Sequence, residues 1–366
     1  MRVFICHIFS HVRDWSDFSY HNCTRYFSPR SKQPPIWRAI SMNPHNSRIW
    51  YTNQMNILFL RVIICNFEGL FIGGSVTTLV IIGNGFDIQN GLPTSYWHFH
   101  QRYHGRLDEH FSFFPEFFDD QEWSNFEENL GIFNEDEFNE QAAWQPSMED
   151  MVESSSHLYG YEDEIAQKVD ELVDDVTTSF ITWVRAVDVT LASQLFDFPD
   201  GAKFINFNYT STLQDVYSIP DEDVLHIHGK ARWNVILGHG IGNGNQSTSI
   251  AFNENAPWFD ESQRTLASVT DKFHKPVPDI LERYRAQLEG YGDIEKIIVI
   301  GHSGNDIDLP YFRCILNAYP DAIWENWNHG DGISDTHSRL IALGVPQHQL
   351  SSSPSSDLGT TYPVAG

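Results

Sequence analysis

Residues 77–87 read TTLVIIGNGFD, and this stretch decides the fold class. Its first six residues, Thr77–Ile82, form a continuous β-branched and apolar run, which is typical of a strand buried on both faces of a parallel sheet. Gly83 and Gly85 then allow a sharp turn, and Thr94 or Ser95 can cap a following helix. Strand, glycine turn and helix in this order predict an α/β domain.

Similar apolar runs recur along the chain and are separated by segments with helical spacing. Helices are predicted over about 160–195 and 279–288, and the aromatic, acidic region 105–195 is interpreted as a helical subdomain inserted into the sheet. We therefore predict a doubly wound, mainly parallel sheet of Rossmann-like type. The further strands are expected at residues 203–207, 224–228, 235–237, 296–300 and 322–324.

Charge divides the chain near residue 73. Residues 1–73 carry a formal charge of +5, whereas the remainder carries −31. We interpret residues 1–73 as a leader of uncertain order, and the internal Met55 leaves open that this leader is not native. Residues 74–350 are predicted to form a single domain, and the Ser- and Pro-rich residues 351–366 a flexible tail.

Composition excludes several classes of function. With 49 acidic and 23 basic residues and a net charge of −26, the chain would repel a phosphate backbone, so no nucleic-acid partner is expected. Arg61 and Glu68 interrupt the apolar stretch 58–74, so no membrane partner is expected. Four irregularly spaced cysteines form neither a disulfide framework nor paired metal-binding motifs, which predicts a reducing, cytoplasmic location.

Polar motifs containing glycine, asparagine or histidine follow the predicted strands. Since ligands of open α/β sheets bind at the carboxyl ends of the strands, these motifs predict a common nucleotide-type site. The motifs are GNGFD at 83–87, FNYT at 207–210, HIHG at 226–229, GHG at 238–240 and GHSGNDID at 301–308.

The glycine turn is expected to approach a phosphate group. Gly83 and Gly85 lack Cβ atoms, so backbone amides can face the ligand, and Gly85→Val is expected to block binding while leaving the fold intact. Asp87 would accept hydrogen bonds from ribose hydroxyls or from amides of the turn. Ile88 occupies the position of the third glycine of the dinucleotide fingerprint, so a tight turn without a ligand remains an equal alternative.

Two residues are predicted to act in catalysis. His228 lies at a strand end before Gly229, where an imidazole can transfer a proton, and His226 is expected on the same face of that strand. Asn208 can hold a ribose hydroxyl or orient a water molecule. In the last motif, Ser303 can donate to a phosphate or ribose, whereas Asp308, just before a Leu-Pro pair, also fits the N-cap of a helix.

The motifs, in this order, resemble those of the bacteriophage abortive infection AbiH family over about residues 76–327. The strings that carry the resemblance are VIIGNGFDIQNGLPTSY, WSNFEENLG, FINFNYTSTLQDVY, HIHG, ILGHG and IIVIGHSGNDIDLPYF. Membership implies a role in bacterial defence, in which phage-infected cells stop growing or die. A phage-derived trigger and a homo-oligomer are compatible with such a role.

The same positions show a fainter resemblance to the sirtuin-like NAD-binding fold. Asp87 stands where sirtuins usually have serine, and the four-cysteine zinc module is impossible because Cys314 is the only cysteine after residue 73. The resemblance therefore implies NAD as ligand or substrate, not protein deacetylation. The expected catalytic residues are Asn208 and His228, and the expected ligand-binding residues are Gly83, Asn84, Gly85, Phe86, Asp87, Gly301, Ser303 and Asp308.

Three hypotheses of function follow. The first is an enzyme that hydrolyses NAD or a related nucleotide, and the second is a sensor that binds the nucleotide without turnover and signals to a partner. The third is a metal-dependent hydrolase, in which His226, His228, His239 and His302 supply ligands together with Asp306 or Asp308. We expect no metal, because a metal site would leave the glycine turn unexplained.

Overall fold

The computed structural model describes residues 37–42, 47–52, 78–114, 123, 125–142, 149, 153, 156–240 and 260–365. The chain divides into two compact units, residues 1–73 and 74–366. In the first unit, β1 (Trp37–Met42) and β2 (Ser47–Thr52) form an antiparallel pair. The sequence of this region showed no sustained strand pattern, so the pair was not predicted. All further elements belong to the second unit.

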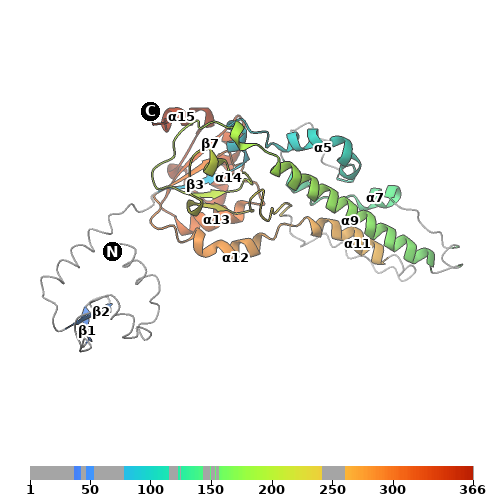
Figure 1. Cartoon of the computed structure of the whole chain (residues 1–366), viewed down its shortest axis with the longest axis horizontal. Helices are drawn as coiled ribbons and strands as arrows, with labels where there is room; N and C mark the ends of the chain where they lie inside the picture. Colours follow the sequence, from blue (N-terminus) through green and yellow to red (C-terminus); the bar gives the residue numbers. More distant parts are fainter. Residues whose placement is uncertain are drawn as a thin grey trace, which may run out of the picture. The chain divides into compact units, whose positions relative to one another are not determined.

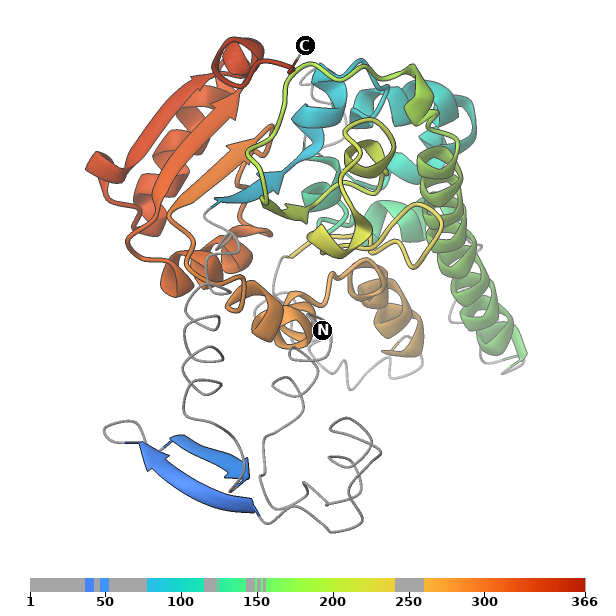
Figure 2. The same cartoon turned by 60° about the vertical axis from the view of Figure 1, so that its left-hand side comes forward.

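The second unit is built on a six-stranded sheet in which every neighbouring pair is parallel (Figure 2). The strands are β3 (Thr78–Ile82), β4 (Lys203–Asn206), β5 (Val224–His226), β6 (Lys296–Ile300), β7 (Ile323–Asn328) and β8 (Leu350–Pro354). Their spatial order is β5-β4-β3-β6-β7-β8, so the chain starts in the middle, builds outward on one side and then on the other. This order is that of the Rossmann doubly wound fold.

Two apolar layers cover the sheet, one on each face. One layer contains α12 (Val277–Leu288), α13 (Leu309–Ala318) and α14 (Gly332–Leu343), packed on side chains such as Ile81 and Val299. The other contains α4 (Asn84–Gln89), α10 (Thr212–Asp215) and α15 (Leu358–Thr361), packed on Val80 and Ile298. Alternate residues of one strand thus enter opposite cores. The predicted doubly wound, mainly parallel α/β fold is confirmed.

A third apolar core lies in the helical subdomain. Helix α9 (Ser156–Arg185) runs alongside α11 (Asp260–Lys272), and α5 (Tyr96–Phe111), α6 (Phe126–Asn129) and α7 (Glu135–Ala142) complete the subdomain (Figure 1). Aromatic side chains of the described part of this region, such as Phe113, Phe126 and Phe138, fill this core. The subdomain also includes α11, which follows β5 in the chain. This helix was not part of the insertion predicted at residues 105–195.

Three local expectations differ from the structure. Residues 235–237 form no strand, although Ile236 N donates to the carbonyl oxygen of His228. The last predicted strand is not the last, because Leu350–Pro354 forms β8 beside β7, although residues 351–366 were expected to form a flexible tail. Serine-rich β8 lies at the sheet edge, where it needs no continuous apolar run; this is why its pattern resembled a tail.

The short 3-10 helices lie at chain turns, at Val189–Leu191, Asp221–Asp223, Gln347–Gln349 and Ser355–Asp357.

Candidate functional site

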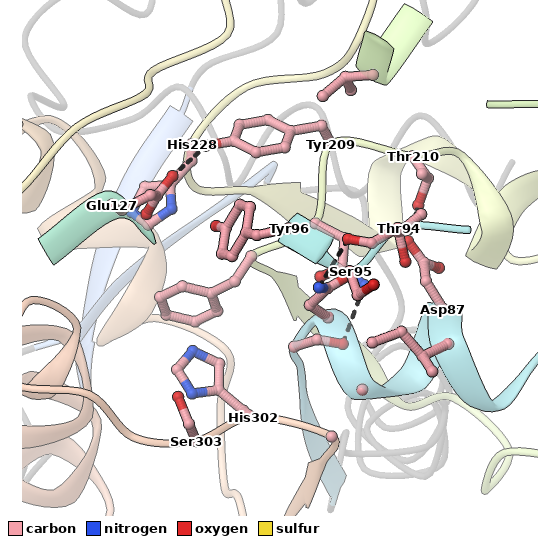
Figure 3. Close-up of a pocket in the computed structure, with 18 of the residues that line it drawn as sticks. Asp87, Thr94, Ser95, Tyr96, Glu127, Tyr209, Thr210, His228, His302 and Ser303 are labelled. Atoms are coloured by element: carbon pink, nitrogen blue, oxygen red, sulfur yellow. Dashed lines mark hydrogen bonds between the residues drawn. The ribbon is translucent and has the colours of Figure 1, made fainter. Parts of the chain in front are cut away.

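A cleft of about 270 Å³ opens where the carboxyl ends of β3 and β6 meet. These two strands flank the point at which the sheet changes direction, the usual ligand position in such folds. Nine of the ten predicted site residues line this cleft, although four separate segments of the chain supply them. In Figure 3, Asp87, His228, His302 and Ser303 lie around it.

The tenth residue, Phe86, lies elsewhere. Its side chain is fully buried and packs against Phe196, Phe198 and Tyr217 in the core beneath α4. In a helix, neighbouring residues point in different directions, so Asp87 and Phe86 cannot share one face. The expectation that Phe86 contacts a ligand is therefore wrong.

The glycine turn brings two pieces of backbone into contact. Gly85 N donates to the carbonyl oxygen of Gly301 at 2.8 Å, and a Cβ atom built on Gly85 would lie 2.8 Å from Gly301 Cα. Gly301 has φ +62°, and its own Cβ would lie 2.2 Å from Phe86 N. These glycines are required by the close approach of the turns after β3 and β6. We therefore expect Gly85→Val to disturb that approach and to destabilise the fold, contrary to the expectation from the sequence.

Asp87 joins helix α4 to the loop after β4. Its two carboxylate oxygens accept hydrogen bonds from Thr210 Oγ1 (2.6 Å) and Thr212 Oγ1 (2.7 Å). Burial raises the pKa of Asp87 to about 6, and these hydroxyl groups and Asn208 oppose the rise. The carboxyl group therefore has protein partners already, which were not among those foreseen from the sequence.

Asn208 and Asn84 are both held by the backbone of neighbouring turns. Asn208 Nδ2 donates to Gly83 O at 3.0 Å, and its backbone amide donates to Asn206 Oδ1. Asn84 Nδ2 donates to Thr94 O at 2.8 Å. The amide of Asn208 is thus oriented before any ligand binds, which a group that positions a reactant requires.

The two predicted histidines diverge. Strand β5 ends at His226, so the alternation of the strand does not extend to His228. His226 is held by Gln214 Nε2 and by the carbonyl oxygen of Asn208, and burial lowers its pKa to about 4. His228 lines the cleft. Burial and the charge of Lys275 lower the pKa of His228 to about 3, so the imidazole is uncharged at pH 7. A general base works best with a pKa near 7, and the pKa of His228 lies well below that value.

Asp308 lies between two imidazoles. His228 Nε2 is 3.7 Å from Asp308 Oδ1, and His302 Nε2 is 3.5 Å from Asp308 Oδ2. Gly304 N donates to His302 Nδ1, which leaves the ring proton on Nε2, facing Asp308. Burial acts to raise the pKa of Asp308, but the His302 hydrogen bond and the interactions with His228 and Lys275 lower it to about 2.

Asp308 is also the N-cap residue of α13 by position, yet its side chain makes no cap hydrogen bond. The sequence interpretation as a capping side chain is therefore wrong, because the carboxylate turns toward the cleft instead. Within the described residues, His228 Nε2 and Asp308 Oδ1 are both buried and have no hydrogen-bond partner.

A second polar group at the cleft was missed from the sequence. Glu127 of α6 lines the cleft and accepts a hydrogen bond from Lys275 Nζ at 2.8 Å. Tyr209 OH lies 3.0 Å from Glu127 Oε1 and 2.8 Å from Ile236 O (Figure 3). Lys275 follows no recognisable motif. The only sequence signal for the pair is the charge of Glu127 within an aromatic stretch.

The four histidines of the metal hypothesis do not converge. His239 Nε2 bonds to the carbonyl oxygen of Thr270, whereas His226 bonds to Gln214. Across the described ranges, no group of three or more His, Cys, Asp or Glu side chains has a geometry suited to a metal ion. Over the same ranges, no helix is long and apolar enough to cross a membrane.

The fold and the cleft define a doubly wound α/β protein whose candidate site lies at the change of strand order. The family model described as "Bacteriophage abortive infection AbiH" matches residues 79–325, and the chain belongs to this family. No curated protein and no solved structure matches the chain. The matched range contains β3 to β6, the helical subdomain and every predicted site residue.

Proposed function

We propose that this chain acts in abortive infection by binding NAD or a related nucleotide in the cleft and hydrolysing the bond between ribose and nicotinamide. The observation that carries the proposal is the buried pair formed by His228 Nε2 and Asp308 Oδ1, neither of which has a hydrogen-bond partner in the part of the chain that the structure describes. Leaving a buried polar atom unpaired costs about 1–3 kcal/mol. A ribose hydroxyl that reaches between the two groups would remove this cost.

The electrostatics of the cleft suit this reaction. When the glycosidic bond breaks, its electron pair leaves with the nicotinamide nitrogen, and positive charge develops on the ribose. Water oxygen then bonds to the ribose carbon and its proton is released to solvent. Asp308, whose pKa is lowered to about 2, is ionised at pH 7 and would stabilise the developing cation.

The remaining residues would orient the reactants. His228 is neutral, so it would hold a hydroxyl by hydrogen bonding instead of accepting a proton. Asn208, fixed on the carbonyl oxygen of Gly83, would hold the water or a second hydroxyl. Asp87 is engaged by two threonines, so its contribution would be to keep α4 in place.

A nucleotide-binding sensor is the second candidate, and the Lys275–Glu127 ion pair favours it. Glu127 belongs to the helical subdomain, whereas Lys275 lies between α11 and α12 and Tyr209 follows β4. A ligand beside Glu127 would thus contact a junction between subdomain and sheet. Such contacts can shift a conformational equilibrium only if the ligand binds the two states with different affinities.

The test is incubation of the full chain with NAD and, separately, with ATP, with and without lysate from phage-infected cells, followed by chromatography of the products. We expect nicotinamide and ADP-ribose from NAD. Asp308→Asn should lower the rate about 10²-fold or more. The matched control is Asp306→Asn, since Asp306 is 82% exposed and pairs with Arg339 outside the cleft.

Tight binding of a nucleotide without any turnover, in the triggered wild-type protein, would reject the enzyme and leave the sensor.

A further inference from the structure

The lining of the cleft within the described residues is acidic and contains no lysine or arginine. Four of the lining residues are carboxylates, namely Asp87, Glu127, Glu128 and Asp308. The segments after residue 77 that the structure leaves undescribed also contain no Lys or Arg in the sequence. A phosphate group inside the cleft would therefore meet carboxylates without a basic partner from this part of the chain.

Lys275, the cation next to the cleft, is already paired. Its side chain is 0% exposed and does not line the cleft, and its ammonium group neutralises Glu127. Asp87 is bonded to hydroxyl groups, and Asp308 faces two imidazoles. Within the described residues, neither of these carboxylates, nor the exposed Glu128, has a Lys or Arg within ion-pair distance. The cleft therefore has a net negative charge.

Part of the lining of the cleft is apolar and aromatic. Phe180, Trp183 and Val184 of α9 belong to this part, with Val187 beyond the end of the helix and Ile88 on α4. Such a lining suits a flat ring, and an indole attracts a ring that carries positive charge. A cationic heterocycle in the cleft would thus have both aromatic side chains and carboxylates within the same lining.

The volume limits how much of a dinucleotide can enter. Pockets for small molecules are about 300–1,000 Å³, and this cleft, at about 270 Å³, lies just below that range. It matches a nucleoside better than a complete dinucleotide. Any phosphate would then remain outside, away from the carboxylates.

We propose that the cleft recognises a cationic N-riboside, such as the oxidised nicotinamide riboside end of NAD, and leaves phosphate groups outside. This inference rests on the proposed function and names its substrate class. It distinguishes the oxidised ring, which is cationic, from the uncharged reduced ring. It also places nucleoside triphosphates, which are polyanions without a cationic ring, among the weakest ligands.

The experiment is calorimetric titration of the full chain with five compounds: nicotinamide riboside, NAD, NADH, ADP-ribose and ATP, with chromatography to account for heat of hydrolysis. We expect nicotinamide riboside to bind at least as tightly as NAD, and the other three at least tenfold more weakly. Raising the salt concentration should weaken the binding of nicotinamide riboside, since screening reduces its attraction to the carboxylates.

Asp308→Asn should reduce the preference for NAD over NADH by removing one of these charges, whereas Asp306→Asn should leave that preference unchanged. NADH or ATP binding as tightly as NAD would overturn this inference while the proposed function stands. If none of the five compounds binds, the proposed function fails, and the inference with it.

Discussion

The buried ion pair between Lys275 and Glu127 offers a quantitative test of how the helical subdomain is held on the sheet. The side chain of Lys275 is 0% exposed and that of Glu127 is 14% exposed. Glu127→Gln would leave a fully buried ammonium group without its closest counter-ion. Removing one partner of a buried pair costs about 3–5 kcal/mol, so we expect a loss of stability in that range.

The reverse change should cost less. Lys275→Met leaves a carboxylate that still reaches the cleft and still has the hydroxyl of Tyr209 at 3.0 Å, so we expect a loss of about 2 kcal/mol. In the double variant neither charge remains, and apolar replacement of a buried pair is often neutral. The double variant should therefore be more stable than Glu127→Gln alone.

Urea unfolding of the full chain, followed by tryptophan fluorescence, measures all three variants. With a denaturant slope of about 3 kcal/mol per molar urea, Glu127→Gln should lower the midpoint by about 1–1.7 M. Glu128→Gln, at the exposed neighbouring residue, is the control and should change stability by less than about 0.5 kcal/mol. A Glu127→Gln protein as stable as the wild type, or a double variant as unstable as the sum of the single variants, would refute this account.

Three further predictions concern the cleft. Burial raises the folded-state pKa of Asp87 from 3.8 to about 6, so the contribution of this residue to stability declines as the pH rises from 5 to 7. Asp87→Asn lacks this titration. In urea unfolding, the free energy of unfolding of the variant relative to the wild type should therefore increase by about 1.3 kcal/mol between pH 5 and pH 7. Gly301→Ala should destabilise the protein about 2 kcal/mol more than Gly304→Ala, since both residues have positive φ but only the first Cβ would meet backbone, at 2.2 Å; equal thermal unfolding of the two variants would contradict this. His228→Gln should slow nicotinamide release about 10²-fold, whereas the control His348→Gln, at an exposed histidine, should not change the rate. Because the pKa of His228 is about 3, any inflection of the wild-type pH–rate profile between pH 5 and 8 should remain in His228→Gln.

Much of the fold follows from local sequence patterns. The runs before Gly83 and Gly301 are apolar on both faces, and only the centre of a parallel sheet buries a strand in this way, so β3 and β6 were predicted within a residue. The edge strand β8 escaped detection because its serines carry no such pattern. The antiparallel pair β1 and β2 was not expected either, because its strands contain no continuous apolar run.

The sequence by itself predicted that strand-end motifs from distant segments would gather at one edge of a sheet, because the carboxyl ends of parallel strands lie together. Four of the five motifs line the cleft, whereas GHG at 238–240 follows no strand and does not. Only the tertiary structure decided what each residue does there. It set Gly85 against Gly301, engaged Asp87 with threonine hydroxyls, and turned Asp308 from the helix cap toward two histidines. The physical reason is that close approach, burial and the pKa values that depend on them arise from contacts between segments, such as that of Lys275 with Glu127, about which local spacing holds no information.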